Sequence, residues 1–160
     1  MSTENQISLI NNPQEFTRLY NAILKAEHGD DFLAIDDDRA DRGNDGYLKS
    51  ECRIYAGHCF KRVQNQSLDS EIRRKMVSDL KKAIALKKSE DWQITAWTFI
   101  SNYPIVHDIV RDLYDMGREE GIDVAWRGPA DLADLLQRHP HLRPRFPILQ
   151  INHLKRKFQD

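Results

Sequence analysis

The sequence has 160 residues, and its 24 basic and 25 acidic side chains leave a formal net charge of −1. With 40% hydrophobic and 31% charged residues, it has the composition of a globular protein and not of a disordered one. No stretch approaches the roughly 18 apolar residues of a membrane-spanning helix, and the first residues lack the features of a secretory signal. Two cysteines are too few for a disulfide framework. We therefore expect one cytoplasmic domain over residues 1–160, with no membrane partner.

The first helix is predicted from its cap and its apolar spacing. Residues 1–12 are polar, and we expect them to be frayed. Asn12 is a suitable N-cap and Pro13 a suitable first helical residue. The apolar side chains that follow, from Phe16 to Leu24, repeat at the spacing of an amphipathic helix, which should end at His28–Gly29.

Two strands and a short apolar run follow this helix. The apolar run is 32–35, and the polar residues 36–44 after it form a turn. Residues 45–48 and 53–63 are predicted as strands joined by the turn 49–51, because the second is rich in β-branched and aromatic side chains.

The second half of the chain alternates helices and strands. The elements are a helix capped by Asp69 or Ser70 and reaching residue 88, a strand over 92–100, a helix from Pro104 to Gly121, a strand over 122–126, a helix from Gly128–Pro129 to Pro140, and a basic C-terminal segment over 148–160. Strands that alternate with helices predict an α/β fold in which a mixed sheet is sandwiched by helices.

Acidic side chains are concentrated near the first turn. Eight carboxylates lie between Glu27 and Asp45, against only Arg39 and Arg42. A solvated loop is the ordinary interpretation, and a cation site is the alternative. Glu27 follows Phe16 by eleven residues, about three helical turns, so it shares the face of the apolar stripe. The ordinary interpretation of Glu27 is a side chain at the edge of the buried face that reaches solvent or pairs with an arginine.

One set of residues has the chemistry of a phosphodiesterase site. Glu27 lies on the inner face of a helix, Asp45 begins a strand, and Lys61 lies on the next strand. Mg²⁺ binds one or two carboxylates, waters and substrate phosphate. A nearby lysine can orient the attacking water and stabilise the charge that develops on phosphorus.

The run Gly-Asn-Asp-Gly-Tyr-Leu at 43–48, followed by the strand 53–61, resembles the restriction-endonuclease-like fold of the PD-(D/E)xK superfamily. The branch it looks like is the Mrr-type domains of bacterial anti-phage and other conflict systems. Residues 97–104 and 121–146 are similar to the later strands and helices of those domains. The resemblance covers roughly residues 14–147.

The resemblance implies roles for individual residues. Asp45 matches the metal-binding aspartate, Glu27 the acidic residue that many members carry on the first helix, and Lys61 the motif lysine. The family places Asp, Glu or Gln two residues before that lysine, and this chain has Cys59 there. A thiol is a poor ligand for Mg²⁺.

The helix over residues 71–88 carries a basic face. A solvated surface is the ordinary interpretation. In a nuclease-like domain the same face would contact DNA phosphates without reading sequence, and the side chains expected to do so are Arg73, Arg74, Lys81 and Lys82.

Two functions stay open at this point. The first is an Mg²⁺-dependent DNA endonuclease of a bacterial defence system, with Asp45 and Glu27 as metal ligands and Lys61 as the catalytic lysine. The second is a catalytically inactive module that binds nucleic acid or a partner subunit of a defence complex. In either case we expect a homodimer or a complex with a partner.

Overall fold

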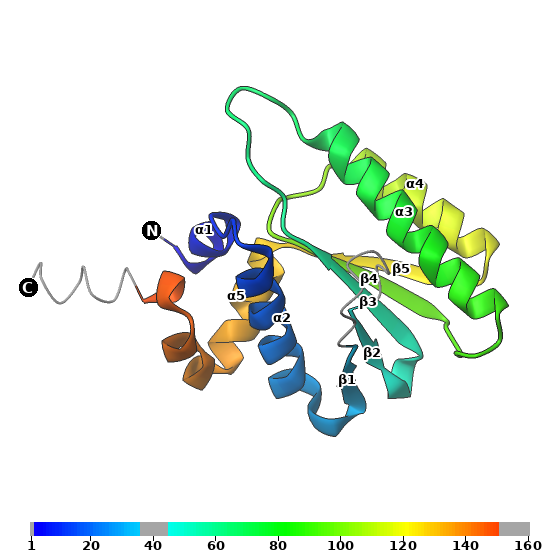
Figure 1. Ribbon diagram of the computed structural model, residues 1–160, viewed down its shortest axis with the longest axis horizontal. Coiled ribbons are helices and arrows are strands. Elements are labelled where there is room, and N and C mark those ends of the chain that lie inside the picture. The colour runs from blue at the N-terminus through cyan, green and yellow to red at the C-terminus, as the bar shows by residue number, and fades with distance from the viewer. Residues whose placement is uncertain (1, 36–44, 151–160) are drawn as a thin grey trace, which may run out of the picture.

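The computed structural model describes residues 2–35 and 45–150. A single five-stranded sheet runs through the molecule in the order β1-β2-β3-β4-β5 (Figure 1). The strands are β1 (Phe32–Ala34), β2 (Gly46–Leu48), β3 (Arg53–His58), β4 (Ala96–Ser101) and β5 (Asp123–Arg127).

The sheet is mixed because its connections differ in length. β1, β2 and β3 pair antiparallel, and only the short helical turn Lys49–Glu51 separates β2 from β3. β3, β4 and β5 pair parallel, and each of these two connections contains a long helix, as a parallel crossover requires. All six residues of β4 are buried, which is the pattern of a central strand covered on both faces.

Helices cover both faces of the sheet (Figure 1). Helices α1 (Thr3–Ser8), α2 (Pro13–His28) and α5 (Pro129–Arg138) lie on one face, together with the short turns Pro140–Arg145 and Pro147–Leu149. Helices α3 (Asp69–Lys88) and α4 (His107–Glu119) lie on the other face. The chain is therefore a mixed α/β protein, as its sequence predicts. No helix in the described residues is long and apolar enough to cross a membrane.

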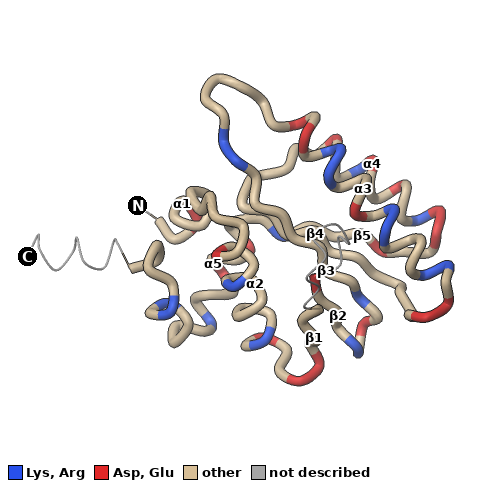
Figure 2. The backbone as a smooth tube through the Cα atoms, in the orientation of Figure 1, with Lys and Arg blue, Asp and Glu red and all other residues tan. Residues whose placement is uncertain are grey.

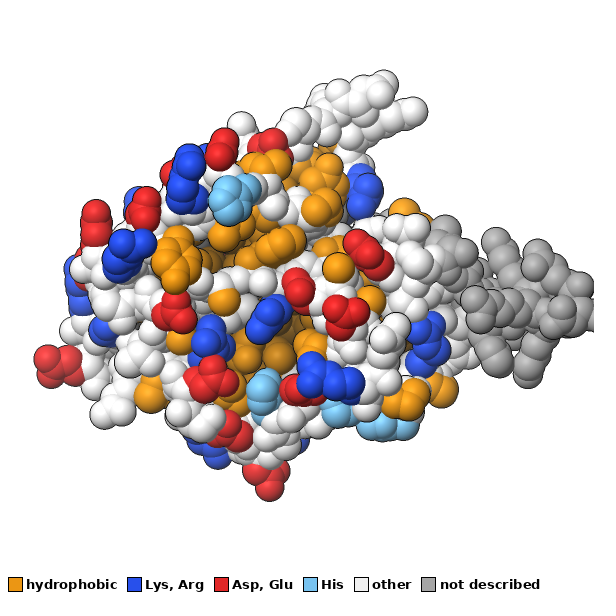
Figure 3. All heavy atoms as spheres, turned by 180° about the vertical axis from the view of Figure 1, so that it is seen from behind, with side chains coloured by type: hydrophobic (Ala, Val, Ile, Leu, Met, Phe, Trp, Pro, Cys, Tyr) orange, Lys and Arg blue, Asp and Glu red, His pale blue; other side chains and the backbone are white. Residues whose placement is uncertain are grey.

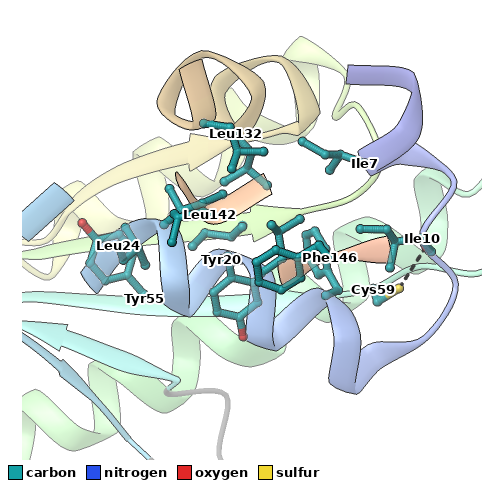
Figure 4. Close-up of a cluster of buried hydrophobic side chains, with 14 of the residues drawn as sticks. Ile7, Ile10, Tyr20, Leu24, Tyr55, Cys59, Leu132, Leu142 and Phe146 are labelled. Atoms are coloured by element: carbon teal, nitrogen blue, oxygen red, sulfur yellow. Dashed lines mark hydrogen bonds between the residues drawn. The ribbon is translucent and has the colours of Figure 1, made fainter. Parts of the chain in front are cut away.

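Helix α2 forms as the sequence indicates. The Asn12 side chain accepts a hydrogen bond from the Glu15 N–H at 2.9 Å, and Pro13 occupies the first turn. Its apolar stripe is fully buried against the sheet, within one of two hydrophobic clusters (Figure 4). The helix ends at Gly29, whose φ of 60° favours glycine.

The prediction that residues 1–12 are frayed is wrong. Thr3–Ser8 form helix α1, which lies against α5. Ile7 and Ile10 are buried in the same cluster as α2. The amide of Asn102 donates to the Ile10 carbonyl at 2.8 Å, so a contact across more than half of the chain fixes this segment.

The second prediction to fail is the length of β3. The strand ends at His58 and not at residue 63. Asn102 explains this end, because its Oδ1 accepts the Phe60 N–H at 2.7 Å and its Nδ2 donates to the Phe60 carbonyl at 3.0 Å. These bonds replace those of a strand ladder, and Lys61 therefore does not lie on a strand. β4 and α4 also begin later than predicted, at Ala96 and His107.

Candidate functional site

Asp45 lies at the start of β2, where its backbone N–H donates to the Tyr55 carbonyl at 2.7 Å. Its carboxylate accepts the Gly57 N–H at 2.6 Å and a hydrogen bond from the Tyr20 hydroxyl. Gly57 makes this arrangement possible, since a Cβ there would lie 2.5 Å from the Tyr20 ring. Burial nevertheless raises the pKa of Asp45 above its ordinary value.

A second buried carboxylate lies on α3. Asp79 has 0% exposed surface, and the ammonium groups of Lys75 and Lys82 lie 3.1 and 3.9 Å from its Oδ1. Neither of its oxygens accepts a well-oriented hydrogen bond from the described residues. Burial raises the pKa of Asp79, Lys75 opposes the shift, and the charge of Asp45 adds to it. The two aspartates are therefore close enough to repel each other.

Asp45, Lys75 and Asp79, with His58 and Tyr20 beside them, form what we call the Asp45–Asp79 cluster. His58 ends β3, and burial together with the charge of Lys75 lowers its pKa to about 4. At neutral pH the cluster thus holds a neutral imidazole, one ammonium and two carboxylates whose ionisation is disfavoured. The Lys75 ammonium offsets part of the cost of burying these carboxylates, and a bound cation would offset more of it.

Glu27 does not belong to this cluster. Its Oε1 lies 3.0 Å from Arg138 and its Oε2 lies 2.8 Å from His139. The hydrogen bond from His139, and secondarily the charge of Arg138, lower the pKa of Glu27. The interpretation that Glu27 pairs with an arginine at the edge of the buried face is therefore confirmed.

Lys61 is the third predicted catalytic residue. It is exposed and follows the end of β3. Its charge acts on Cys59, whose pKa burial raises and Lys61 lowers in part. Cys59 itself is buried, and its thiol donates to the Ile10 carbonyl at 3.3 Å. Within the described residues, each of the three predicted site residues thus has different neighbours, and no contact joins Glu27, Asp45 and Lys61.

The predicted DNA-binding residues of α3 differ in their surroundings. Basic and acidic residues are interspersed along α3 and α4 (Figure 2). Arg73 forms an ion pair with Asp112 of α4, and Lys82 lies beside Asp79. Arg74 and Lys81 line an exposed groove on α3 together with Arg73, Val77 and two serines. Neither Arg74 nor Lys81 has a hydrogen bond or ion pair with any residue in the described ranges.

Sequence reasoning missed Asp79, although a signal for it was present. Asp79 follows Ile72 by seven residues, almost two full helical turns, so it lies on the apolar face of α3. The same argument singled out Glu27. The lysines that surround Asp79 in the sequence are typical of a solvated face and obscure this signal.

A shared magnesium site for Asp45 and Glu27 does not fit this geometry, because both oxygens of Glu27 already have cationic or hydrogen-bonding partners. Within residues 2–35 and 45–150, no group of three or more His, Cys, Asp or Glu side chains is placed to hold a metal ion. The acidic residues at 36–41 lie outside the described residues, as does the predicted C-terminal segment from residue 151. No family model and no curated protein matches the chain.

Proposed function

We propose that this chain is a non-hydrolytic, restriction-endonuclease-like module that binds the DNA backbone. One observation carries the proposal: Glu27 and Lys61, which hydrolysis would require beside Asp45, have other surroundings, whereas Arg74 and Lys81 are exposed on α3 without carboxylate partners in the described chain. The resemblance adds a bacterial defence system as the setting, with a partner subunit or a second copy of the chain.

The topology supports this proposal. A helix, an antiparallel β1-β2-β3 meander, a crossover helix and a parallel fourth strand occur in that order. Asp45 immediately precedes the second strand, and the resemblance gives this place to the metal-binding aspartate. Its carboxylate is used instead to hold Gly57 and Tyr20.

The basic face supports the choice of DNA as ligand. Between Asp69 and Lys88, α3 carries seven basic and three acidic side chains. Arg74 and Lys81 are seven residues apart, so they project from nearly the same face, about 10 Å apart along the helix. Cations that are not neutralised within the protein release counterions when they contact phosphates, which favours sequence-independent binding.

The experiment measures binding of a fluorescent 20-base-pair duplex at several salt concentrations. We expect Arg74→Gln with Lys81→Gln to weaken binding and to lower the slope of log K against log salt by about 2. The matched control is Arg111→Gln with Arg118→Gln on α4, since these two arginines pair with Asp108 and Asp115. Equal binding by both double variants would refute the proposal.

A second candidate function is Mg²⁺-dependent phosphodiester hydrolysis at the Asp45–Asp79 cluster. The observation in its favour is Asp79, whose two buried oxygens accept no well-oriented hydrogen bond from the described residues, although the Lys75 ammonium lies 3.1 Å from one of them. Asp45 and Asp79 would hold the ion, which polarises a phosphate oxygen when bound. Lys75 would orient a water molecule. Plasmid cleavage with Mg²⁺ or Mn²⁺ that Asp45→Asn and Asp79→Asn both abolish would support this candidate over the first.

A further inference from the structure

A polar cavity of about 300 Å³ lies between α2 and α5, on the face of the sheet opposite to α3. Its floor is formed by β3, β4 and β5, and its walls by the last turns of α2 and by α5. In the view of the molecule from behind, charged and histidine side chains surround a hollow (Figure 3). Pockets that bind small molecules begin at about this volume.

Three hydrogen-bond donors on the floor are suited to bind an oxyanion: Tyr55, Arg127 and, as described below, Thr98. Tyr55 is 5% exposed, and its hydroxyl has no hydrogen-bond partner in the described residues, although it points out of the packed cluster (Figure 4). Arg127, at the end of β5, has no ion pair or hydrogen bond with any described residue. Arg53, Arg127 and Glu51 line the same cavity as Tyr55, and the charges of all three act on the Tyr55 hydroxyl.

Arg53 is held in place beneath the cavity. Its Nη1 donates to the Thr98 hydroxyl at 2.7 Å, and its Nη2 lies 3.0 Å from Glu51. Because the Thr98 oxygen accepts this bond, the Thr98 hydroxyl hydrogen is available to a ligand. The floor therefore presents two fixed donors and one free guanidinium before any ligand binds, which lowers the entropy cost of binding.

The walls restrict which anions fit. Four carboxylates line the cavity. Glu27 and Glu51 are paired with basic side chains, and Asp131 accepts the Gly128 N–H at 2.9 Å. Asp134 is exposed on α5. These carboxylates would repel each further negative charge of a ligand, so a ligand with one anionic group fits the cavity better than one with several.

We propose that this cavity is a binding site for a small molecule with a single phosphate or carboxylate group, which Tyr55, Arg127 and Thr98 hold on the floor. The site is separate from the α3 face proposed for DNA, so each proposal can fail without the other.

The test is isothermal titration calorimetry of the full chain with adenosine 5′-monophosphate, inorganic phosphate and acetate, which distinguishes phosphate from carboxylate. Adenosine without phosphate and adenosine triphosphate are the comparison ligands. We expect at least one of the three oxyanions to bind, adenosine not to bind, and the triphosphate to bind more weakly than the monophosphate.

Variants locate the binding. Arg127→Gln should weaken it about tenfold, as loss of a charge-assisted hydrogen bond does, and Tyr55→Phe about threefold. Arg127 is exposed and Phe keeps the buried ring, so both variants should fold. Arg111→Gln is the matched control and should bind as the original chain does. No binding of any oxyanion, or equal binding by Arg127→Gln and Arg111→Gln, would overturn the proposal.

Discussion

A carboxylate on one face of the sheet and a carboxylate on the other have opposite electrostatic surroundings. On the α2 face, Glu27 is neutralised by Arg138 and His139, and its pKa is lowered. On the α3 face, Asp79 has two lysines near one oxygen but no well-oriented hydrogen bond in the described chain, and its pKa is raised. Glu27 therefore stabilises the fold at neutral pH, whereas ionised Asp79 opposes it.

This difference separates structural from functional candidates. A carboxylate that stabilises its surroundings is explained by folding alone. One that costs stability requires another explanation, and a ligand or a cation is the usual one. By this criterion the Asp45–Asp79 cluster is a better candidate site than Glu27, although the sequence predicts Asp45 and Glu27 together as metal ligands.

The largest expected effect comes from the α2 face at Gly57. An added Cβ would lie 2.5 Å from the Tyr20 ring, so Gly57→Ala should displace Tyr20 and lower the free energy of unfolding by about 2 kcal/mol. Urea denaturation measures this loss. In a Tyr20→Leu background, where the ring is absent, the same change should cost much less. Equal costs in both backgrounds would show that the ring contact is not the cause.

The second-largest expected effect is the loss of stability when Glu27 can no longer carry a charge. Glu27→Gln should lower the free energy of unfolding by about 1 kcal/mol at neutral pH. Because the folded-state pKa of Glu27 is below its ordinary value of 4.5, this contribution is present above pH 4.5 and is lost as pH falls through the folded-state value. Denaturation at several pH values measures it. A difference that persists in acid would contradict the ion-pair explanation.

The third effect has the opposite sign. Asp79→Asn should raise the free energy of unfolding by about 1 kcal/mol at neutral pH, since it removes the cost of a buried charge. The folded-state pKa of Asp79 lies above its ordinary value of 3.8. The cost is therefore present at higher pH and disappears as pH falls toward 3.8.

Asp112→Asn is the matched control for this prediction, because Asp112 is a half-exposed aspartate in an ion pair. It should change stability much less than Asp79→Asn does. If Asp79→Asn destabilises the protein at neutral pH, the attraction of Lys75 outweighs burial and the contrast between the two faces is wrong.

Local patterns in the sequence were sufficient to predict most of the elements. The Asn12 cap and the stripe from Phe16 to Leu24 depend on neighbouring residues, and α2 follows them. The end of β3 could not be predicted in this way. Cys59 and Phe60 continue a strand-like sequence, but Asn102 and Ile10, both far away in the chain, take their hydrogen bonds.

The candidate site was harder to predict than the fold for the same reason. The spacing of Glu27 correctly indicated a carboxylate on a buried face, but only the packing of α5 supplies Arg138 and His139 to neutralise it. The importance of Asp79 depends on Asp45, which lies in a different element 34 positions earlier in the chain. The cavity on the other face combines three strands and two helices, and no short motif encodes it.

The buried amide of Asn102 has a practical consequence for anyone who shortens this protein. It joins the backbone at Ile10 and Phe60 to the end of β4, so the first dozen residues complete the interior although their composition suggests a dispensable tail. A version trimmed to begin at Pro13 would leave that amide one acceptor short and uncover the Cys59 thiol. Affinity tags are therefore better attached to the chain than exchanged for its start.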